Sequence, residues 1–262
     1  MTKMLRLYKI KALIYRDWVT MSKTKHRIIE ILFFPVTTAL IWGLFANYFK
    51  AFSLETAMML LVINVFWSFS FLSQSSANMQ INMDVWSRSL NQLLVSGITE
   101  AEYIVARVLF SINVSLIILA LMLWIISWFG FVMPALGPFL LLVFVTLMAS
   151  TALGILIVAL YIRLGREYSF LTWSFLQLII LLSAPFFPVE TYPAFMHGFV
   201  RMLPHTWIFE ALRGLATHGA LTMSAVFRAL MLSVIYLVIV FPFYMYTFRK
   251  ARKTGALVRL GF

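Results

Sequence analysis

The chain is dominated by apolar runs of about 20 residues, each the length of a helix that crosses a bilayer. Inside a bilayer only a helix or a closed barrel pairs all of its backbone groups. The runs do not alternate between apolar and polar residues, which excludes an outer-membrane β-barrel. The chain is 63% hydrophobic and 11% charged, whereas about 25% of a soluble domain is charged. We therefore expect an all-α integral membrane protein, a single transmembrane domain over residues 1–262.

Six transmembrane helices are expected, and an even number places both termini on the same side of the membrane. The predicted spans cover residues 28–49, 57–73, 103–128, 139–162, 169–187 and 229–247. Basic residues gather on the cytoplasmic side of membrane proteins. Placing both termini in the cytoplasm leaves only four of the 21 lysines and arginines outside, namely Lys50, Arg201, Arg213 and Arg228. A net charge of +12 also occurs in nucleic-acid-binding proteins, but these charges cluster at the ends of the spans, which favours membrane orientation and no nucleic acid.

The N-terminal segment, residues 1–27, is basic and contains a single acid, Asp17. Leu7, Ile10, Ile14 and Trp18 recur at helical spacing, so we expect an amphipathic helix that lies in the membrane interface. Its charged region is too long for a cleaved signal peptide. Two roles remain open: the helix orients the chain only, or it also forms a cytoplasmic rim that contacts a partner.

Residues 82–99 form a polar region between the second and third spans. Trp86, Leu90 and Leu93 share one face of a short predicted helix over residues 84–94, which Gly97 ends. Thr99 and Glu102 then have the spacing of a capping box that starts the next helix. The short helix is either a connector that packs on the chain itself or a docking helix for another protein.

Residues 178–214 begin as an apolar span and are then interrupted by prolines. Two short amphipathic external helices are expected over residues 188–220, with Glu210 and Arg213 spaced as an i,i+3 pair. This stretch holds most of the charge of the outer face. We interpret it as a gate or seal at an exit.

Sequence patterns typical of ion coupling, nucleotide binding, hydrolysis and metal binding are absent from the chain. No charged residue or histidine occupies the middle of a predicted span, so coupling to protons or sodium is not expected. No phosphate-binding glycine loop, hydrolase elbow or zinc motif is present, and cysteine is absent. The histidines lack ligand spacing. A metal site from His197, His205 and Glu210 is the alternative to ordinary interface histidines, which we favour. We expect no catalytic residue, no metal and no cofactor in this chain.

The chain resembles the permease subunit of ABC-2 type transporters, which is the transmembrane subunit of ABCG-like ABC exporters. The resemblance rests on the basic lead-in helix, the short helix after the second span and the six spans. Its most specific part is Pro185–Phe186–Phe187–Pro188, followed by Leu203–Pro204 and residues 209–213. The chain departs from the family pattern in two places. Leu203–Pro204 stands where the family has Asn-Pro, and Gly97 replaces a more usual proline.

The resemblance implies a complex of two permeases with two cytosolic ABC ATPase subunits, which bind ATP and Mg. A homodimer in a bacterial or archaeal cytoplasmic membrane is expected. The helix at 84–94 corresponds to the coupling helix, which implies ATPase-coupling roles for Asp84, Trp86, Arg88, Leu90 and Leu93. Asp84 and Arg88 are the expected rim contacts, while Trp86 and Leu90 are the apolar anchors.

The resemblance further implies a translocation path between two copies, lined by the first, second and fifth spans. The candidate path residues are Phe33, Trp42, Trp67, Phe71, Trp173 and Gln177. The alternative is that half of the aromatic residues face lipid, since interfacial belts have the same composition. The candidate external gate comprises Pro185, Pro188, Glu190, His205, Glu210 and Arg213.

Aromatic residues with few charges favour export of a hydrophobic, amphiphilic or lipid-linked compound. Export of a polysaccharide of the O-antigen, capsule or teichoic-acid type is the alternative within the same class. An alternative of another class is a membrane scaffold that recruits a soluble partner through Trp86. An intramembrane enzyme is disfavoured because no catalytic pair is present.

Overall fold

The computed structural model describes residues 6–87, 89–131 and 135–259, without the side chains of a few residues inside these ranges. The described part of the chain is helical and contains no strand. Its α-helices are α1 (Leu7–Lys23), α2 (Lys25–Phe49), α3 (Leu54–Trp86), α4 (Ser89–Val95), α5 (Glu100–Ser127), α6 (Leu136–Leu164), α7 (Leu171–Leu182), α8 (His197–Met202), α9 (Pro204–His218), α10 (Met223–Lys253) and α11 (Ala256–Arg259). Three 3-10 helices are η1 (Arg166–Phe170), η2 (Val189–Thr191) and η3 (Ala194–Met196). The all-α prediction is confirmed.

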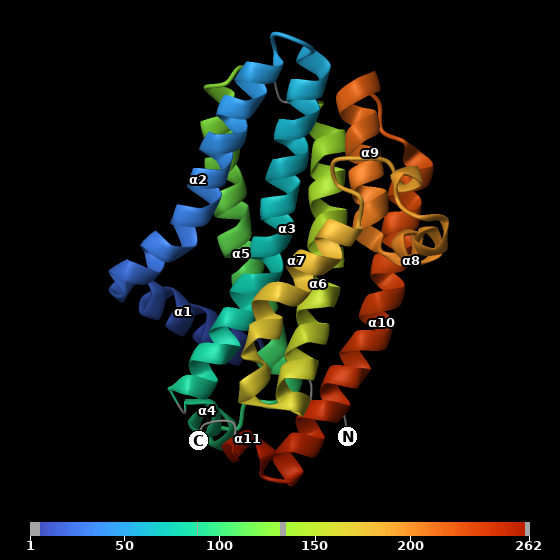
Figure 1. Cartoon of the computed structure of the whole chain (residues 1–262). Helices are drawn as coiled ribbons and strands as arrows, with labels where there is room; N and C mark the ends of the chain where they lie inside the picture. Colours follow the sequence, from blue (N-terminus) through green and yellow to red (C-terminus); the bar gives the residue numbers. More distant parts are fainter. Residues whose placement is uncertain (1–5, 88, 132–134, 260–262) are drawn as a thin grey trace.

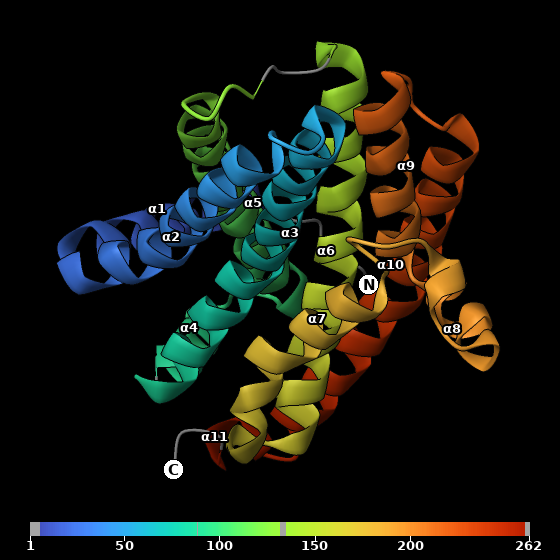
Figure 2. The same ribbon diagram turned by 45° about the horizontal axis from the view of Figure 1, so that its top comes forward.

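Among the described residues, five helices are long and apolar enough to cross a membrane: α2 from Ile31 onward, α3, α5, α6 and α10. In Figure 1 they run side by side between two ends of a bundle. The α2–α3 and α9–α10 connections lie at the upper end, whereas α4, the α6–α7 connection and α11 lie at the lower end (Figure 1). Turning the molecule shows α1 and α2 together on one side, away from α10 (Figure 2). The first and the last helices therefore both reach the lower part of the bundle.

The expected fifth span, residues 169–187, is divided in the structure. Its helix α7 has 12 residues, and at 1.5 Å per residue it is about 18 Å long, short of the roughly 30 Å hydrocarbon core. Ser183 then caps the helix, and Ala184 adopts a left-handed conformation with φ 51° ahead of Pro185. In Figure 1, α7 occupies the lower half of the bundle and α9 the upper half. The count of six complete spans stays a prediction.

Close packing of α6 on α3 fixes the centre of the bundle. The middle of α6 carries small buried residues, among them Ala149, Ser150 and Ala152. A Cβ atom at Gly154 would lie 3.4 Å from Cγ of Gln74, so the two helices approach with little room for a larger residue. The main apolar core lies around this contact, between α2, α3, α5, α6 and α9.

The corner between α4 and α5 forms as the sequence predicts. Thr99 and Glu102 make the reciprocal bonds of a capping box, with Glu102 N 3.2 Å from Thr99 Oγ1 and Thr99 N 2.9 Å from Glu102 Oε2. Gly97 adopts φ 80°, which ends the preceding turn. The short helix itself is placed differently from the prediction. Residues 84–86 belong to the end of α3, because Asp84 is held by ion pairs inside the bundle, and α4 begins only at Ser89.

Candidate functional site

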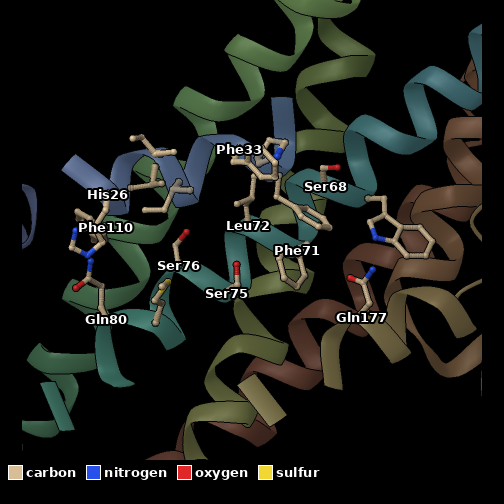
Figure 3. Close-up of a pocket in the computed structure, with 17 residues that line it drawn as sticks. His26, Phe33, Ser68, Phe71, Leu72, Ser75, Ser76, Gln80, Phe110 and Gln177 are labelled. Carbon is tan, nitrogen blue, oxygen red and sulfur yellow. The ribbon is translucent and has the colours of Figure 1, made fainter. Parts of the chain in front are cut away.

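A pocket of about 630 Å³ lies between α2, α3 and α7, with α5 behind it. Phe33 and Phe34 of α2 and Phe71 of α3 provide much of its aromatic surface, and the rings of Phe34 and Phe71 lie 6.4 Å apart. Gln177 of α7 lies at one end, and Figure 3 shows His26 with Gln80 at the other. None of the described residues that line the pocket is Asp, Glu, Lys or Arg. The described lining of the cavity is therefore aromatic and free of formal charge.

One side of this pocket is polar because α3 places hydroxyl and amide groups on it. These buried residues are Ser68, Ser75, Ser76 and Gln80. These four positions lie along one face of the helix. Ser75 and Ser76 are about two turns beyond Ser68, and Gln80 is about one turn further on. Ser75 and Ser76 point into the space between the two ends in Figure 3. The pocket thus combines ring surfaces with hydrogen-bonding groups.

Four of the predicted path residues, Phe33, Trp67, Phe71 and Gln177, line this pocket. Trp42 lies elsewhere, stacked on Phe186 with the ring centroids 5.1 Å apart. Phe186 also stacks on Trp67 at 5.5 Å, so it joins the pocket to the break after α7. The side chain of Trp173 lies outside the described residues.

A buried network of charged groups ties α1, α3 and α5 together at the lower end. Arg107 of α5 is 0% exposed and contacts both Asp17 of α1 and Asp84 of α3, the second at 3.4 Å. Arg16 bridges the same two carboxylates at 2.9 Å each. Tyr103 donates its hydroxyl to Asp84 at 2.8 Å. The two aspartates balance the two arginines, so the buried network is formally neutral.

Neighbouring bonds attach the same corner to the first and last helices. The backbone amide of Arg6 donates to Glu102 at 2.9 Å, and Lys9 donates to the carbonyl of Gly97. From α10, Tyr244 donates to the carbonyl of Glu100 at 3.2 Å, and Arg252 pairs with the Glu100 carboxylate at 3.5 Å. A force applied at the α4–α5 corner would therefore reach α1, α3, α5 and α10 through direct contacts.

The predicted coupling residues divide into exposed and buried groups. Trp86 is 59% exposed at the end of α3, close in sequence to the exposed Met83, and Val95 is exposed at the end of α4. Leu90 is 2% exposed and packs in the chain's own core with Leu93 at its edge, so the expected anchor at Leu90 faces inward. Asp84 is likewise buried, which does not fit the expected rim contact. Arg88 lies outside the described residues.

The predicted external gate folds around the break after α7. Arg213 of α9 donates to the carbonyls of Ala184 and Pro185, at 2.6 and 3.1 Å, and so holds the left-handed residue in place. The carboxylates of Glu190 and Glu210 both attract this guanidinium. Arg213 thus links α9 to the break after α7 through two hydrogen bonds.

Three other gate residues behave differently. Glu190 is exposed and pairs with Arg201 at 3.3 Å. The pKa of its carboxyl lies below the ordinary value because its own backbone amide, and then Arg201, donate to the charged form. His205 is fully buried, with Nε2 3.3 Å from Ser150 Oγ, so it joins α9 to α6 and does not face an exit. Pro188 caps η2 on the exposed side of the break.

Sequence reasoning missed the buried network and the polar side of the pocket. Arg107 is the only charged residue of the predicted span 103–128, and Asp17 is the only acid in the first 27 residues. Those two exceptions were the available signal, because an unpaired charge in such a place needs a partner. No group of three or more His, Cys, Asp or Glu side chains that could hold a metal occurs among the described residues.

Comparison with known proteins agrees with the architecture. The family model described as ABC-2 type transporter matches residues 8–217, from the start of α1 to the end of α9. A search of curated proteins finds no match. This family is a transmembrane permease family and is not itself the ATP-binding part of the transporter. The chain belongs to the ABC-2 type transporter family, as a multi-pass membrane permease subunit of an ABC transporter.

Proposed function

We propose that the chain is the permease of an ATP-driven exporter that moves an uncharged or weakly charged amphiphile out across the cytoplasmic membrane. The observation that carries this proposal is the pocket of about 630 Å³, whose described lining is aromatic and free of formal charge. Aromatic rings favour apolar and ring-bearing cargo, while Ser75, Ser76 and Gln80 add hydrogen-bonding groups for a polar end. Energy for transport comes from ATP hydrolysis by a separate ATPase, bound in two copies, which binds ATP and Mg.

Exposed apolar side chains on α2 support a second copy of the chain as the other wall of the path. Phe33 and Phe34 line the pocket and are also exposed in the single chain. Further along α2, Leu44, Phe45 and Tyr48 are exposed as well. Figure 2 shows this helix on an outer side of the bundle. A homodimer that meets at α2 would enclose the pocket and remove these side chains from lipid.

The polar side of the pocket supports a second cargo class, a polysaccharide. Sugar rings stack on aromatic side chains through their C–H faces, and their hydroxyls bond to serine and glutamine. The two cargo classes differ in size. One pocket of this volume encloses a drug-sized amphiphile, because ligand pockets range from about 300 to 1,000 Å³, whereas a polysaccharide would need a continuous channel through the dimer.

The test is a stimulation screen of ATP hydrolysis by the permease–ATPase complex in lipid nanodiscs. A fluorescent amphiphile should raise the hydrolysis rate, and Phe33→Ala should increase the half-maximal concentration about tenfold, as expected for loss of one aromatic contact worth roughly 1.4 kcal/mol. Phe144→Ala is the matched control, because Phe144 is an equally exposed phenylalanine on α6 that does not line the pocket.

The outcomes separate the proposals. Stimulation by an oligosaccharide that carries no lipid, with no response to amphiphiles, would favour polysaccharide export. Equal effects of the Phe33 and Phe144 changes would contradict the assignment of the pocket as the cargo site. If no ATPase co-purifies with the permease, the membrane scaffold is favoured.

A further inference from the structure

The exposed face of α10 is a continuous apolar stripe that ends in a basic cluster. The stripe repeats at helical spacing through Phe227, Met231, Val234, Val238 and finally Tyr246, all of them exposed. From Phe227 to Tyr246 the helix rises by about 29 Å, which equals the thickness of a bilayer's hydrocarbon core. Tyr246 at the lower end of the stripe matches the Trp and Tyr belts found at membrane interfaces. This face of α10 therefore has the depth profile of a surface in contact with lipid.

The cations follow directly below Tyr246 on the same face. A groove of about 620 Å³ is lined by Pro242, Met245 and Tyr246 in its apolar part and by Arg249, Lys250 and Lys253 in its basic part. The three basic residues are exposed. They lie three to seven positions beyond Tyr246, which at 1.5 Å per residue is about 5–10 Å, the depth of lipid headgroups.

These cations have no acidic partner among the ion pairs that the described residues form. The helix α10 contains no acid. The neighbouring Arg252 turns to the opposite face, where it pairs with Glu100. Three positive charges are thus left facing outward at one depth, next to an apolar groove.

We propose that this groove binds the headgroup of an anionic phospholipid, with one acyl chain along Pro242 and Met245 and the phosphate between Arg249, Lys250 and Lys253. Basic clusters at the cytoplasmic end of a transmembrane helix attract anionic lipids. Charge complementarity and the unbroken apolar stripe above the cluster favour lipid over a soluble protein. The assignment to the cytoplasmic leaflet rests on the proposed orientation of the chain, but the binding of the lipid does not.

The test follows thermal unfolding of the full-length chain in an uncharged detergent during titration with phosphatidylglycerol, phosphatidylcholine or inorganic phosphate. A ligand that binds the folded state raises the unfolding midpoint with its concentration. We expect phosphatidylglycerol to raise the midpoint and the other two compounds to leave it unchanged. The combined change Arg249→Gln, Lys250→Gln and Lys253→Gln should weaken phosphatidylglycerol binding about 100-fold, and Lys250→Gln alone about fivefold.

The matched control removes the same charge elsewhere. Lys11, Lys23 and Lys25 are exposed on α1 and α2 and do not line the groove, so their combined replacement by glutamine should weaken phosphatidylglycerol binding far less than the triple change on α10. Equal losses in both triple variants, an unchanged affinity in the α10 variants, or an equal response to phosphatidylcholine or phosphate would overturn the proposal. The assay contains neither ATPase nor cargo, so its result is independent of the proposed transport function.

Discussion

Arg107 is the residue on which the lower end of the bundle depends most. Its guanidinium is fully buried and meets carboxylates from two other helices, Asp17 on α1 and Asp84 on α3. Taking a charge out of water costs several kcal/mol, which the opposite charges and hydrogen bonds offset only while every member is present. Loss of one member leaves the others buried and unpaired.

We predict that Arg107→Gln lowers the free energy of unfolding by about 3 kcal/mol. Arg16→Gln should cost no more than about 1 kcal/mol, because the Arg16 side chain is 32% exposed and water can replace it. Equilibrium unfolding in mixed detergent micelles measures both. Equal costs for the two substitutions would show that the network does not depend on its buried member.

The contrast between local and distant partners explains which residues could be predicted. Thr99 and Glu102 are three residues apart, so the capping box follows from the sequence alone and is confirmed. Asp17 and Arg107 are 90 residues apart, so the local sequence around either residue does not identify the other as its partner. Leu90 shares the helical face of Trp86 in an ideal helix. In the structure α3 ends between them, with Ser87 as its C-cap, and Leu90 faces inward.

At the scale of elements, the tip formed by α3 and α4 is the best candidate for contact with the ATPase. Trp86 is exposed there, and large aromatic side chains dominate binding energy at protein interfaces. We predict that Trp86→Ala reduces permease-stimulated ATP hydrolysis at least tenfold at a fixed concentration of ATPase. The permease itself should keep its unfolding midpoint, because this side chain adds little to the core.

Trp128 supplies the control for that experiment. It is 61% exposed, against 59% for Trp86, but it follows the far end of α5, about 40 Å along the helix from the α4–α5 corner. Trp128→Ala should leave ATP hydrolysis at the wild-type rate. Normal hydrolysis after Trp86→Ala would place the ATPase contact on another part of the lower end.

The break after α7 is the element that the sequence describes least completely. The prolines correctly predicted an interruption, but the length of α7 depends on Ser183 and Ala184, and on Arg213 of α9, which donates to the carbonyls of Ala184 and Pro185. No propensity predicts a left-handed alanine, because alanine has no local reason to adopt that conformation. The long helices were predictable, since length and hydropathy alone decide them.

We predict that Arg213→Gln impairs transport while the permease still binds its ATPase. The guanidinium orients the break between α7 and α9, whereas the docking tip at α4 lies at the lower end of the bundle (Figure 1). Glu190→Gln should have a much smaller effect, because its pair with Arg201 is exposed on both sides. Co-purification of the ATPase measures docking and vesicle uptake measures transport. Loss of the complex in Arg213→Gln would show that this residue has a structural role in the whole bundle.

For the whole molecule, the structure separates three tasks in space. The lower end joins four helices at the α4–α5 corner, the pocket lies between α2, α3 and α7, and the proline break lies between α7 and α9. The aromatic members of the pocket were predictable from composition and the resemblance. Its serines and Gln80 were not, because their burial in the pocket depends on how α2 and α5 pack against α3.

The most direct measurement of the central claim is ATP-dependent uptake of a fluorescent amphiphile into inside-out vesicles that contain the permease and its ATPase. Uptake is expected only when both proteins and hydrolysable ATP are present. It should fall strongly with Trp86→Ala or Phe33→Ala and stay at the wild-type level with Trp128→Ala or Phe144→Ala. Uptake by the permease without ATPase, or hydrolysis at the full rate with no directed uptake of any amphiphile, would contradict the account.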